Sequence, residues 1–419
     1  MIDDAAAPTS ADVVVAGRPT AGRREFLALV TALMATSALA IDFSLPAFPD
    51  IRAEFGMSPD ATTVGTLVTV FFLGMAVGPW FYGPLSDRYG RRPPLFIGLV
   101  LYVVSAVLAA IAPTWGLLVV ARFVWGLGSA STRTLCMAMI RDRFEGDAMA
   151  HALSMIMAVF LLVPILAPSV SALLLTALPW RAVFWIPALV AALLMVWARR
   201  LPETHAAEHR RPFTWRAIGR AAREVVGHRQ SMSYTLAVTF LLGVLYVYIA
   251  GSEVIVEDVY DHGRWFPLFF GAIGVLFAVS SLNNARLVRR LGLTALVRRM
   301  AVVGTGLAAV FVGVAVATGG RPNFIVFSVL VGLVVASVQG LITNCNTAAL
   351  SPLAHVAGTA AAIVSTVSTA GGSLLASLAN GSFNGSTMPF TVFVGAYVGL
   401  AALFVLFGAT PSRRAGHTQ

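Results

Sequence analysis

Long apolar stretches, separated by short polar segments, follow one another along almost the whole chain. Each has about the 20 residues that an α-helix needs to cross a bilayer. There are twelve of them, at residues 25–46, 61–82, 93–112, 115–140, 148–176, 180–199, 230–252, 264–287, 295–317, 322–347, 354–380 and 388–409. The pattern predicts an all-α integral membrane protein with twelve transmembrane helices.

The composition and the placement of arginine agree with this prediction. Charged residues make up only 11% of the chain, whereas a soluble domain has about 25%. All 29 basic residues are arginines, and 23 of them fall in segments that are cytoplasmic if both termini are cytoplasmic, against 4 in the opposite segments. Positive residues gather in cytoplasmic loops, so we expect both termini inside. Because the arginines lie at the ends of apolar stretches, the net charge of +10 does not indicate nucleic-acid binding.

A polar, basic segment divides the twelve stretches into six and six. Residues 287–292 (Leu-Val-Arg-Arg-Leu-Gly) also repeat the arrangement of residues 85–90 (Leu-Ser-Asp-Arg-Tyr-Gly). Two six-helix repeats related by an axis along the membrane normal are one way in which transporters are built. The sequence therefore predicts two pseudo-symmetric six-helix bundles. The expected units are a cytoplasmic tail (1–24), an N-terminal bundle (25–200), a basic cytoplasmic linker (201–229), a C-terminal bundle (230–409) and a cytoplasmic tail (410–419). Within the linker, residues 215–223 are expected to form an amphipathic helix.

The segment between the second and third stretches carries a specific motif. Residues 83–92 read Gly-Pro-Leu-Ser-Asp-Arg-Tyr-Gly-Arg-Arg. A very short loop needs glycine where the backbone turns tightly, and an aspartate there can pair with an arginine or accept from a helix N-terminus. The segment resembles the loop after the second helix of major facilitator transporters. The resemblance implies the two-bundle fold of that superfamily and a conformational role for Gly83, Asp87, Arg88, Gly90 and Arg91.

One acid, Asp42, and two arginines, Arg122 and Arg133, lie within predicted spans, whereas Glu253, Glu257, Asp258 and Asp261 are expected in the outer loop after the seventh span. Asp42 lies about a turn before the end of the first span, and Arg122 lies at a comparable depth in the fourth. A charge inside the bilayer is costly and points to function by default, so we expect the two to pair. Two interpretations remain: the pair couples transport to protons, with Asp42 as the proton carrier, or it is a structural link between the first and fourth helices.

The residues around Asp42 and Arg122 carry a narrower resemblance. Residues 42–49 (Asp-Phe-Ser-Leu-Pro-Ala-Phe-Pro) are similar to the opening motif of the Bcr/CflA group of drug:proton antiporters, and Arg122-x-x-x-Gly126 is similar to its proton-relay motif. The resemblance implies a secondary active exporter of neutral or amphiphilic drugs, of the amphenicol or bicyclomycin type, with Asp42 and Arg122 as its coupling residues. Pro164 and Pro168 occupy the place of the group's helix-five antiporter motif, without its paired glycines.

The expected substrate cavity is lined by aromatic, amide and hydroxyl side chains that the span pattern places on inner faces. The candidates are Met34, Ser37, Phe43, Trp125, Tyr246, Tyr248, Gln339, Asn344, Ser365 and Thr369. Trp125 stands where the family usually has glutamine. For each residue alone, helix packing is the alternative role. Together they suit neutral, medium-sized organic molecules.

Other classes of function find no support in the sequence. No phosphate-binding loop, zinc-protease motif or nucleophile elbow occurs, which argues against an enzyme, and no ligand spacing indicates a metal or cofactor. We expect a monomer in the bacterial inner membrane that takes a small-molecule substrate and protons as its partners, with a role in antibiotic resistance. Two alternatives remain: an exporter or symporter of a native metabolite or siderophore, and a membrane receptor that does not transport.

Overall fold

The computed structural model describes residues 22–58, 61–206, 208 and 215–408, and within them it contains helices and no strand. The elements used below are α1 (Arg23–Asp42), η1 (Leu45–Ala47), α2 (Phe48–Glu54), η2 (Thr62–Gly65), α3 (Thr66–Val77), α4 (Pro79–Tyr89), α5 (Arg92–Ala110), α6 (Trp115–Arg143), α7 (Gly146–Leu175), α8 (Ala182–Trp197), η3 (Ala198–Arg200), α9 (Trp215–Gly227), α10 (Arg229–Val254), η5 (Ile255–Val259), η6 (Gly263–Trp265), α11 (Phe266–Leu291), α12 (Leu293–Ala317), α13 (Phe324–Leu350), η7 (Ser351–Val356), α14 (Ala357–Asn380) and α15 (Met388–Gly408).

The fold class predicted from the sequence is confirmed. In the described residues, 11 helical segments are long and apolar enough to cross a membrane. The remaining predicted span is α6, whose 29 residues include Arg122 and Arg133 in mid-helix. Large apolar side chains on the outer surface are exposed, among them Leu173 (71%) and Ile325 (70%). In a bilayer such side chains contact lipid, because a helix that satisfies its own backbone can present an apolar surface to hydrocarbon.

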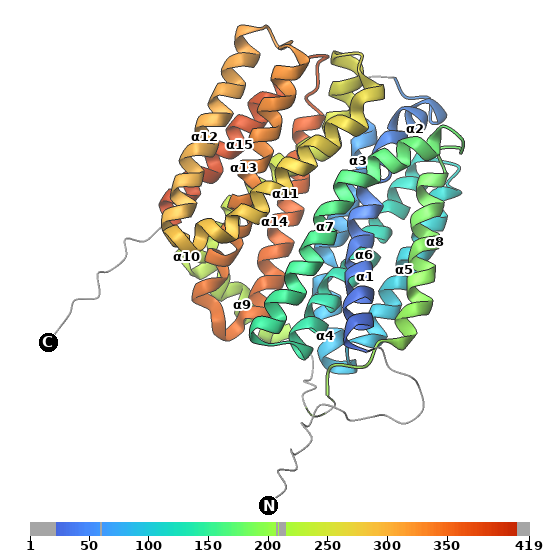
Figure 1. Cartoon of the computed structure of the whole chain (residues 1–419), viewed down its shortest axis with the longest axis vertical. Coiled ribbons are helices and arrows are strands. Elements are labelled where there is room, and N and C mark those ends of the chain that lie inside the picture. Colours follow the sequence, from blue (N-terminus) through green and yellow to red (C-terminus); the bar gives the residue numbers. More distant parts are fainter. Residues whose placement is uncertain (1–21, 59–60, 207, 209–214, 409–419) are drawn as a thin grey trace, which may run out of the picture.

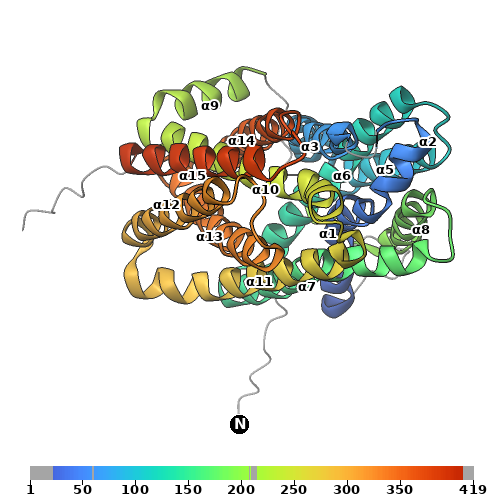
Figure 2. The ribbon, with the colours of Figure 1, turned by 90° about the horizontal axis from the view of Figure 1, so that it is seen from above.

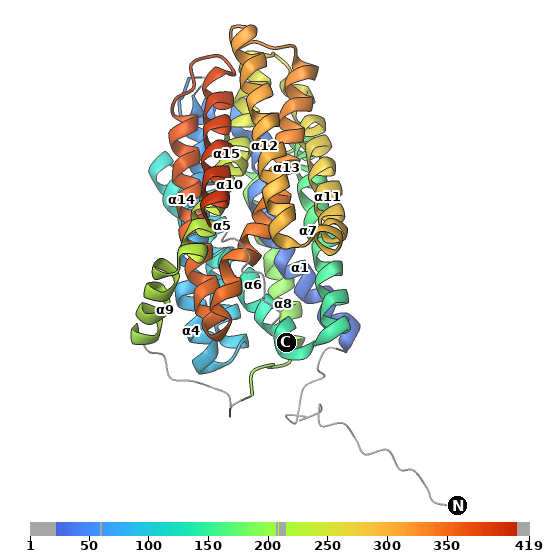
Figure 3. The same ribbon diagram turned by 90° about the vertical axis from the view of Figure 1, so that its left-hand side faces the viewer.

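The helices form two groups that lie side by side (Figure 1). The first group is α1 to α8 and the second is α10 to α15. Across the boundary, α3 contacts α14 and α10, and α7 contacts α11; the view from above shows α3 beside α14 and α7 beside α11 (Figure 2). The helix α9 falls where the sequence predicts an amphipathic helix, and it lies outside the second group, against α14 and α10 (Figure 3).

The turn between α4 and α5 differs from the predicted loop. We expected the second span to end near residue 82 and Gly83 to lie in a turn, but α4 continues to Tyr89 and includes Gly83. Between α4 and α5, Gly90 has a left-handed backbone, with φ 92°, and Gly292 at the end of α11 repeats it with φ 74°. Each accepts this conformation because glycine has no Cβ. One glycine after a continuous helix is therefore enough to reverse the chain in both groups.

The two ends of the molecule differ in their chemistry. The basic end carries the α4–α5 turn, α9 and the C-terminal end of α6 with Arg141 and Arg143. The opposite end carries α2 and η2, and it is uppermost in Figure 1.

Candidate functional site

Arg122 is the most deeply buried charge in the first helix group. Its side chain is fully buried in α6. The guanidinium donates to the carbonyl oxygen of Ala40 at 2.9 Å, to that of Leu67 at 3.3 Å and to Ser44 Oγ at 3.4 Å. Arg122 thus connects α6 to the backbones of α1 and α3, at the depth where the sequence predicts the coupling site.

Aromatic rings complete the surroundings of Arg122. Its guanidinium carbon lies 5.0 Å from the ring centroids of Phe71 and Trp125 and 5.9 Å from that of Phe184. Such cation–π contacts help to offset the loss of hydration. Trp125, which we expected in the cavity wall, is completely buried and packs edge-on against Tyr102. Its role here is to enclose Arg122, because the family's usual glutamine is replaced by a ring large enough to fill this space.

Asp42 is not paired with Arg122. Of the residues that the structure describes, no carboxylate forms an ion pair with Arg122. The expected direct pair is therefore absent from this conformation, because carbonyl groups and Ser44 already take the guanidinium donors. Asp42 is buried at the end of α1, with 4% of its surface exposed. Its charge acts on the hydroxyl group of Tyr248, across the boundary in α10.

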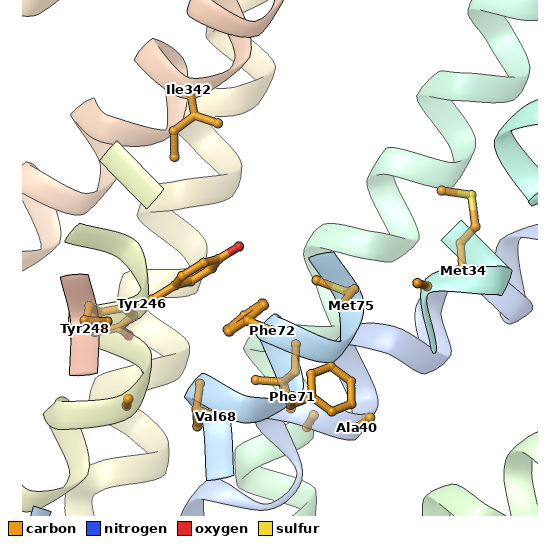
Figure 4. Close-up of a cluster of buried hydrophobic side chains, with 14 of the residues drawn as sticks. Met34, Ala40, Val68, Phe71, Phe72, Met75, Tyr246, Tyr248 and Ile342 are labelled. Carbon is orange, nitrogen blue, oxygen red and sulfur yellow. The ribbon is translucent and has the colours of Figure 1, made fainter. Parts of the chain in front are cut away.

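Tyr246 and Tyr248 of α10 lie at the boundary between the two helix groups (Figure 4). The Tyr246 ring stacks on Phe72 of α3, with centroids 3.7 Å apart and planes at 19°. Its hydroxyl group lies close to Thr369 on α14. Tyr248 stacks on Phe270 at 5.1 Å, and its own hydroxyl group has no hydrogen-bond partner among the described residues. The structure therefore brings four expected site residues, Asp42, Tyr246, Tyr248 and Thr369, to the boundary between the two groups.

Of the remaining cavity candidates, some are accessible and others are buried in contacts between helices. Ser365 is exposed and Gln339 is half-buried. Asn344 is buried and exchanges two hydrogen bonds with Asn284, at 2.8 and 3.1 Å. We expected Asn344 in the cavity wall, but its amide joins α13 to α11, since a buried amide must have its hydrogen bonds made within the protein.

The candidates on α1 are also buried. Ser37 is 4% exposed, and its hydroxyl group bonds to the Met34 carbonyl oxygen of its own helix at 2.8 Å. Met34 is buried to a similar degree, and it is labelled in Figure 4. Phe43 is 3% exposed, and its carbonyl oxygen accepts from Ser171 of α7 at 2.6 Å. The Ser37 hydroxyl group and the Phe43 carbonyl oxygen are thus already hydrogen-bonded within the protein.

Close backbone packing fixes the helix that carries Arg122. A Cβ atom added at Gly126 would lie 1.9 Å from the carbonyl oxygen of Phe71 in α3. Small residues at such positions let membrane helices approach closely. The glycine of the Arg122-x-x-x-Gly126 motif therefore sets the distance over which Arg122 reaches the α3 backbone.

Replacing Gly126 by alanine is expected to destabilise the protein, since overpacking of this kind costs about 1–3 kcal/mol. The matched control is Gly306→Ala in α12, where an added Cβ meets no atom within 4 Å. Alanine is the better helix former by about 1 kcal/mol, so the control should unfold at the same or a higher temperature. Thermal unfolding in detergent micelles measures both. Equal midpoints for the two variants would contradict the contact.

The basic end is held by a network around Arg91. This buried side chain donates to Asp142 Oδ2 at 2.9 Å, to Asp87 Oδ1 at 2.7 Å and to Ser86 Oγ at 2.8 Å. Burial lowers the pKa of Arg91, but its hydrogen bonds to Asp142 and Asp87 outweigh burial and leave that pKa above its usual value. The network ties the end of α4 to the end of α6. Arg88, also expected in the motif, is exposed and lies over the Tyr89 ring at 5.1 Å.

Glu203 is a member of this network that sequence reasoning missed. Its carboxylate accepts from the backbone N–H groups of Arg91 and Arg92 at 2.8 and 3.1 Å. These are free donors at the start of α5, where a negative charge is favourable. A Cβ at Gly90 would lie 2.6 Å from the Glu203 carboxylate, so this glycine also leaves room for it. The only signal in the sequence is an acid just after the sixth span.

The opposite end holds a buried ion pair between the two groups. Arg52 of α2 donates to both carboxylate oxygens of Glu253 in α10, each at 2.9 Å, and the two side chains are 3% and 4% exposed. From the sequence we placed Glu253 in an outer loop and found Asp42 to be the single acid well inside a span. The structure corrects this, because α10 continues to Val254 and encloses Glu253. The two groups also approach closely at Gly65, where a Cβ would lie 3.1 Å from the Ala250 oxygen.

The sequence profile of the Major Facilitator Superfamily matches residues 28–376. The chain belongs to this superfamily. A transporter superfamily is not an enzyme class, and the chain is a multi-pass membrane transporter. In the described part of this major facilitator protein, no cluster of His, Cys, Asp and Glu side chains could hold a metal ion.

Individual relatives agree with the narrower resemblance to the Bcr/CflA group. The chain is 28% identical over 396 residues to an uncharacterised transporter of this superfamily, YdgK of Bacillus subtilis, covering 93% of this chain and 97% of that protein. It is 27% identical over 385 residues to a bicyclomycin resistance protein homologue of Haemophilus influenzae, covering 88% and 92%. A D-xylose–proton symporter has the same fold, with a TM-score of 0.69, 17% identity and coverage of 91% and 97%.

The fifth helix of this major facilitator protein keeps both expected prolines. Pro164 and Pro168 lie inside α7, which continues through them as one helix from Gly146 to Leu175. Pro168 is buried and Pro164 is half-buried. The next residue, Ile165, lies against Gly271 and Gly274 of α11. The motif therefore falls where the fifth and eighth spans cross the boundary.

Proposed function

We propose that this protein exports neutral or amphiphilic drug-like molecules from the cytoplasm in exchange for protons, by alternating access. The observation that carries the proposal is the position of Asp42, a carboxylate buried at the end of α1 that has no ion-pair partner among the described residues. Carboxylates inside membrane spans mark proton pathways by default. The bicyclomycin resistance homologue among its relatives supports a drug as substrate.

The orientation proposed from the arginines places the basic end in the cytoplasm of a bacterial inner membrane. The opposite end, tied by Arg52 and Glu253, is then extracellular. We treat residues 25–200 and 230–409 as the two moving bundles and 201–229 as their linker, with one copy of the chain as the working unit. The structure then corresponds to a state that is closed to the outside.

The proposed cycle alternates substrate and proton. When the opposite end opens, Asp42 takes up a proton from outside, and the substrate leaves. A bound proton removes the cost of burying an unpaired charge, so the protonated carrier can close at that end. Release of the proton to the cytoplasm restores the carboxylate, and a new substrate molecule enters from the basic end. Arg122 stays hydrogen-bonded to the backbones of α1 and α3 throughout.

The test is gradient-driven uptake of a labelled amphenicol into inside-out membrane vesicles. Uptake should require a pH gradient that is acidic inside and should stop when a proton ionophore is added. Vesicles without the protein give the background. Uptake that is insensitive to the ionophore would overturn proton exchange. The absence of any amphenicol uptake would favour export of a native metabolite.

A further inference from the structure

A second arginine lies on the Arg122 face of α6, nearer the basic end. Arg133 follows Arg122 by 11 residues, which places it about 20° away around the helix and about 16 Å along it. Unlike Arg122, its side chain is exposed. About 15 Å of helix separates it from the end of α6 at Arg143, so it is too deep to be an anchor at the membrane surface.

The Arg133 side chain faces the interior rather than lipid. It shares a face with Arg122, which reaches α1 and α3, and with Ser129, which is fully buried between the two arginines. The Arg133 charge also acts on the hydroxyl group of Tyr246, a buried residue of the other helix group. The Arg133 side chain is exposed, and its charge influences Tyr246 of the second group. It therefore lies in accessible space between the two groups.

Nothing in the described residues neutralises this charge. Arg133 forms no ion pair or hydrogen bond with any of them. An arginine within a span normally pairs with another group, as Arg52 pairs with Glu253. A planar guanidinium with free donors binds carboxylate, sulfonate or phosphate oxygens two at a time. The Tyr246 ring, whose hydroxyl group the Arg133 charge influences, stacks on Phe72 across the boundary between the two groups (Figure 4).

We infer that Arg133 is an anion-binding residue of the transport site and that the substrates of this protein include amphiphilic aromatic carboxylates. This inference rests on the proposed function and adds organic anions to the amphiphilic molecules that the protein would export. The direction of transport is consistent with it, because the inside-negative potential favours the exit of an anion.

The test is equilibrium binding to the purified full chain in detergent at pH 7, by isothermal titration. The probes are three matched pairs that differ only in charge: benzoate and benzamide, 2-naphthoate and 2-naphthamide, and 4-biphenylcarboxylate and its amide. At least one acid should bind about tenfold more tightly than its amide, the effect of one charge-assisted contact. Arg133→Gln should remove this preference, and Arg133→Lys should keep part of it. The matched control, Arg141→Gln, removes an exposed arginine two turns further along α6 and should change nothing.

Each result decides the inference independently of proton exchange. Equal affinity for acid and amide in all three pairs, including the absence of binding, overturns it. So does an acid preference that survives Arg133→Gln. If the preference is present and depends on Arg133 while the vesicles show no proton-driven drug uptake, the anion site stands and the proposed function fails. If Arg133→Gln does not purify as a folded protein, the Lys variant and the acid–amide comparison in the unaltered chain still decide.

Discussion

Asp42→Asn is expected to abolish proton-driven accumulation of substrate while substrate exchange continues. Asparagine keeps the size of the side chain but cannot carry a proton, so the substrate and proton movements become uncoupled. One proton that moves down about 100 mV supplies about 2.3 kcal/mol, enough for about a 50-fold accumulation of a neutral substrate. In inside-out vesicles with an imposed gradient, the variant should reach only the external concentration.

The matched control for this prediction is Asp50→Asn. Asp50 lies on α2 near the same end of the protein and is exposed, so its replacement should leave accumulation unchanged. Counterflow of labelled against unlabelled drug, without a gradient, checks that Asp42→Asn still binds and moves substrate. Uphill accumulation by the Asp42 variant would reduce Asp42 to a structural residue.

The arrangement along the chain could be predicted because it depends on length and local composition. Spans of about 20 apolar residues placed most of the helices near their observed ends. The repeat of 85–90 at 287–292 proved to be a repeat of conformation, since Gly90 and Gly292 both have positive φ. Local rules decide such features, and one sequence contains them.

The partners of the inner polar groups could not be predicted, because spans that are apolar on every face give no signal of which side meets which neighbour. Arg122 was expected to pair with Asp42 and instead binds the Ala40 carbonyl. Asn344 was expected to meet substrate and instead binds Asn284. Glu253 was placed in a loop because three further acids (Glu257, Asp258 and Asp261) follow it within eight residues. In each case the deciding contact comes from a residue far away in the sequence.

Breaking the Arg52–Glu253 pair from one side is expected to have the second large effect, on the opposite end of the protein. Glu253→Gln leaves the Arg52 charge buried without a counter-charge, and loss of one partner of a buried pair costs about 3–5 kcal/mol. Part of this cost disappears if the two helix groups separate at this end and water reaches Arg52. The variant should therefore favour the state that is open there.

Cysteine labelling measures that opening, because both native cysteines, Cys136 and Cys345, are buried and can be replaced by alanine. Ser252→Cys then places a thiol beside Glu253, at a position that is 1% exposed. A membrane-impermeant maleimide should label it at least tenfold faster when Glu253→Gln is added.

The matched control for the buried pair is a second ion pair at the same end, Arg181–Glu54. Its side chains are 32% and 43% exposed, and exposed pairs contribute only about 0–1 kcal/mol, so Glu54→Gln should leave the labelling rate unchanged. Exchanging the two residues, as Arg52→Glu with Glu253→Arg, restores opposite charges and should slow labelling again. If Glu253→Gln labels no faster than the parent, the pair does not hold this end closed. Closure would then depend on the apolar and backbone contacts between α3, α10 and α14, because these are the other elements that join the two groups near Gly65.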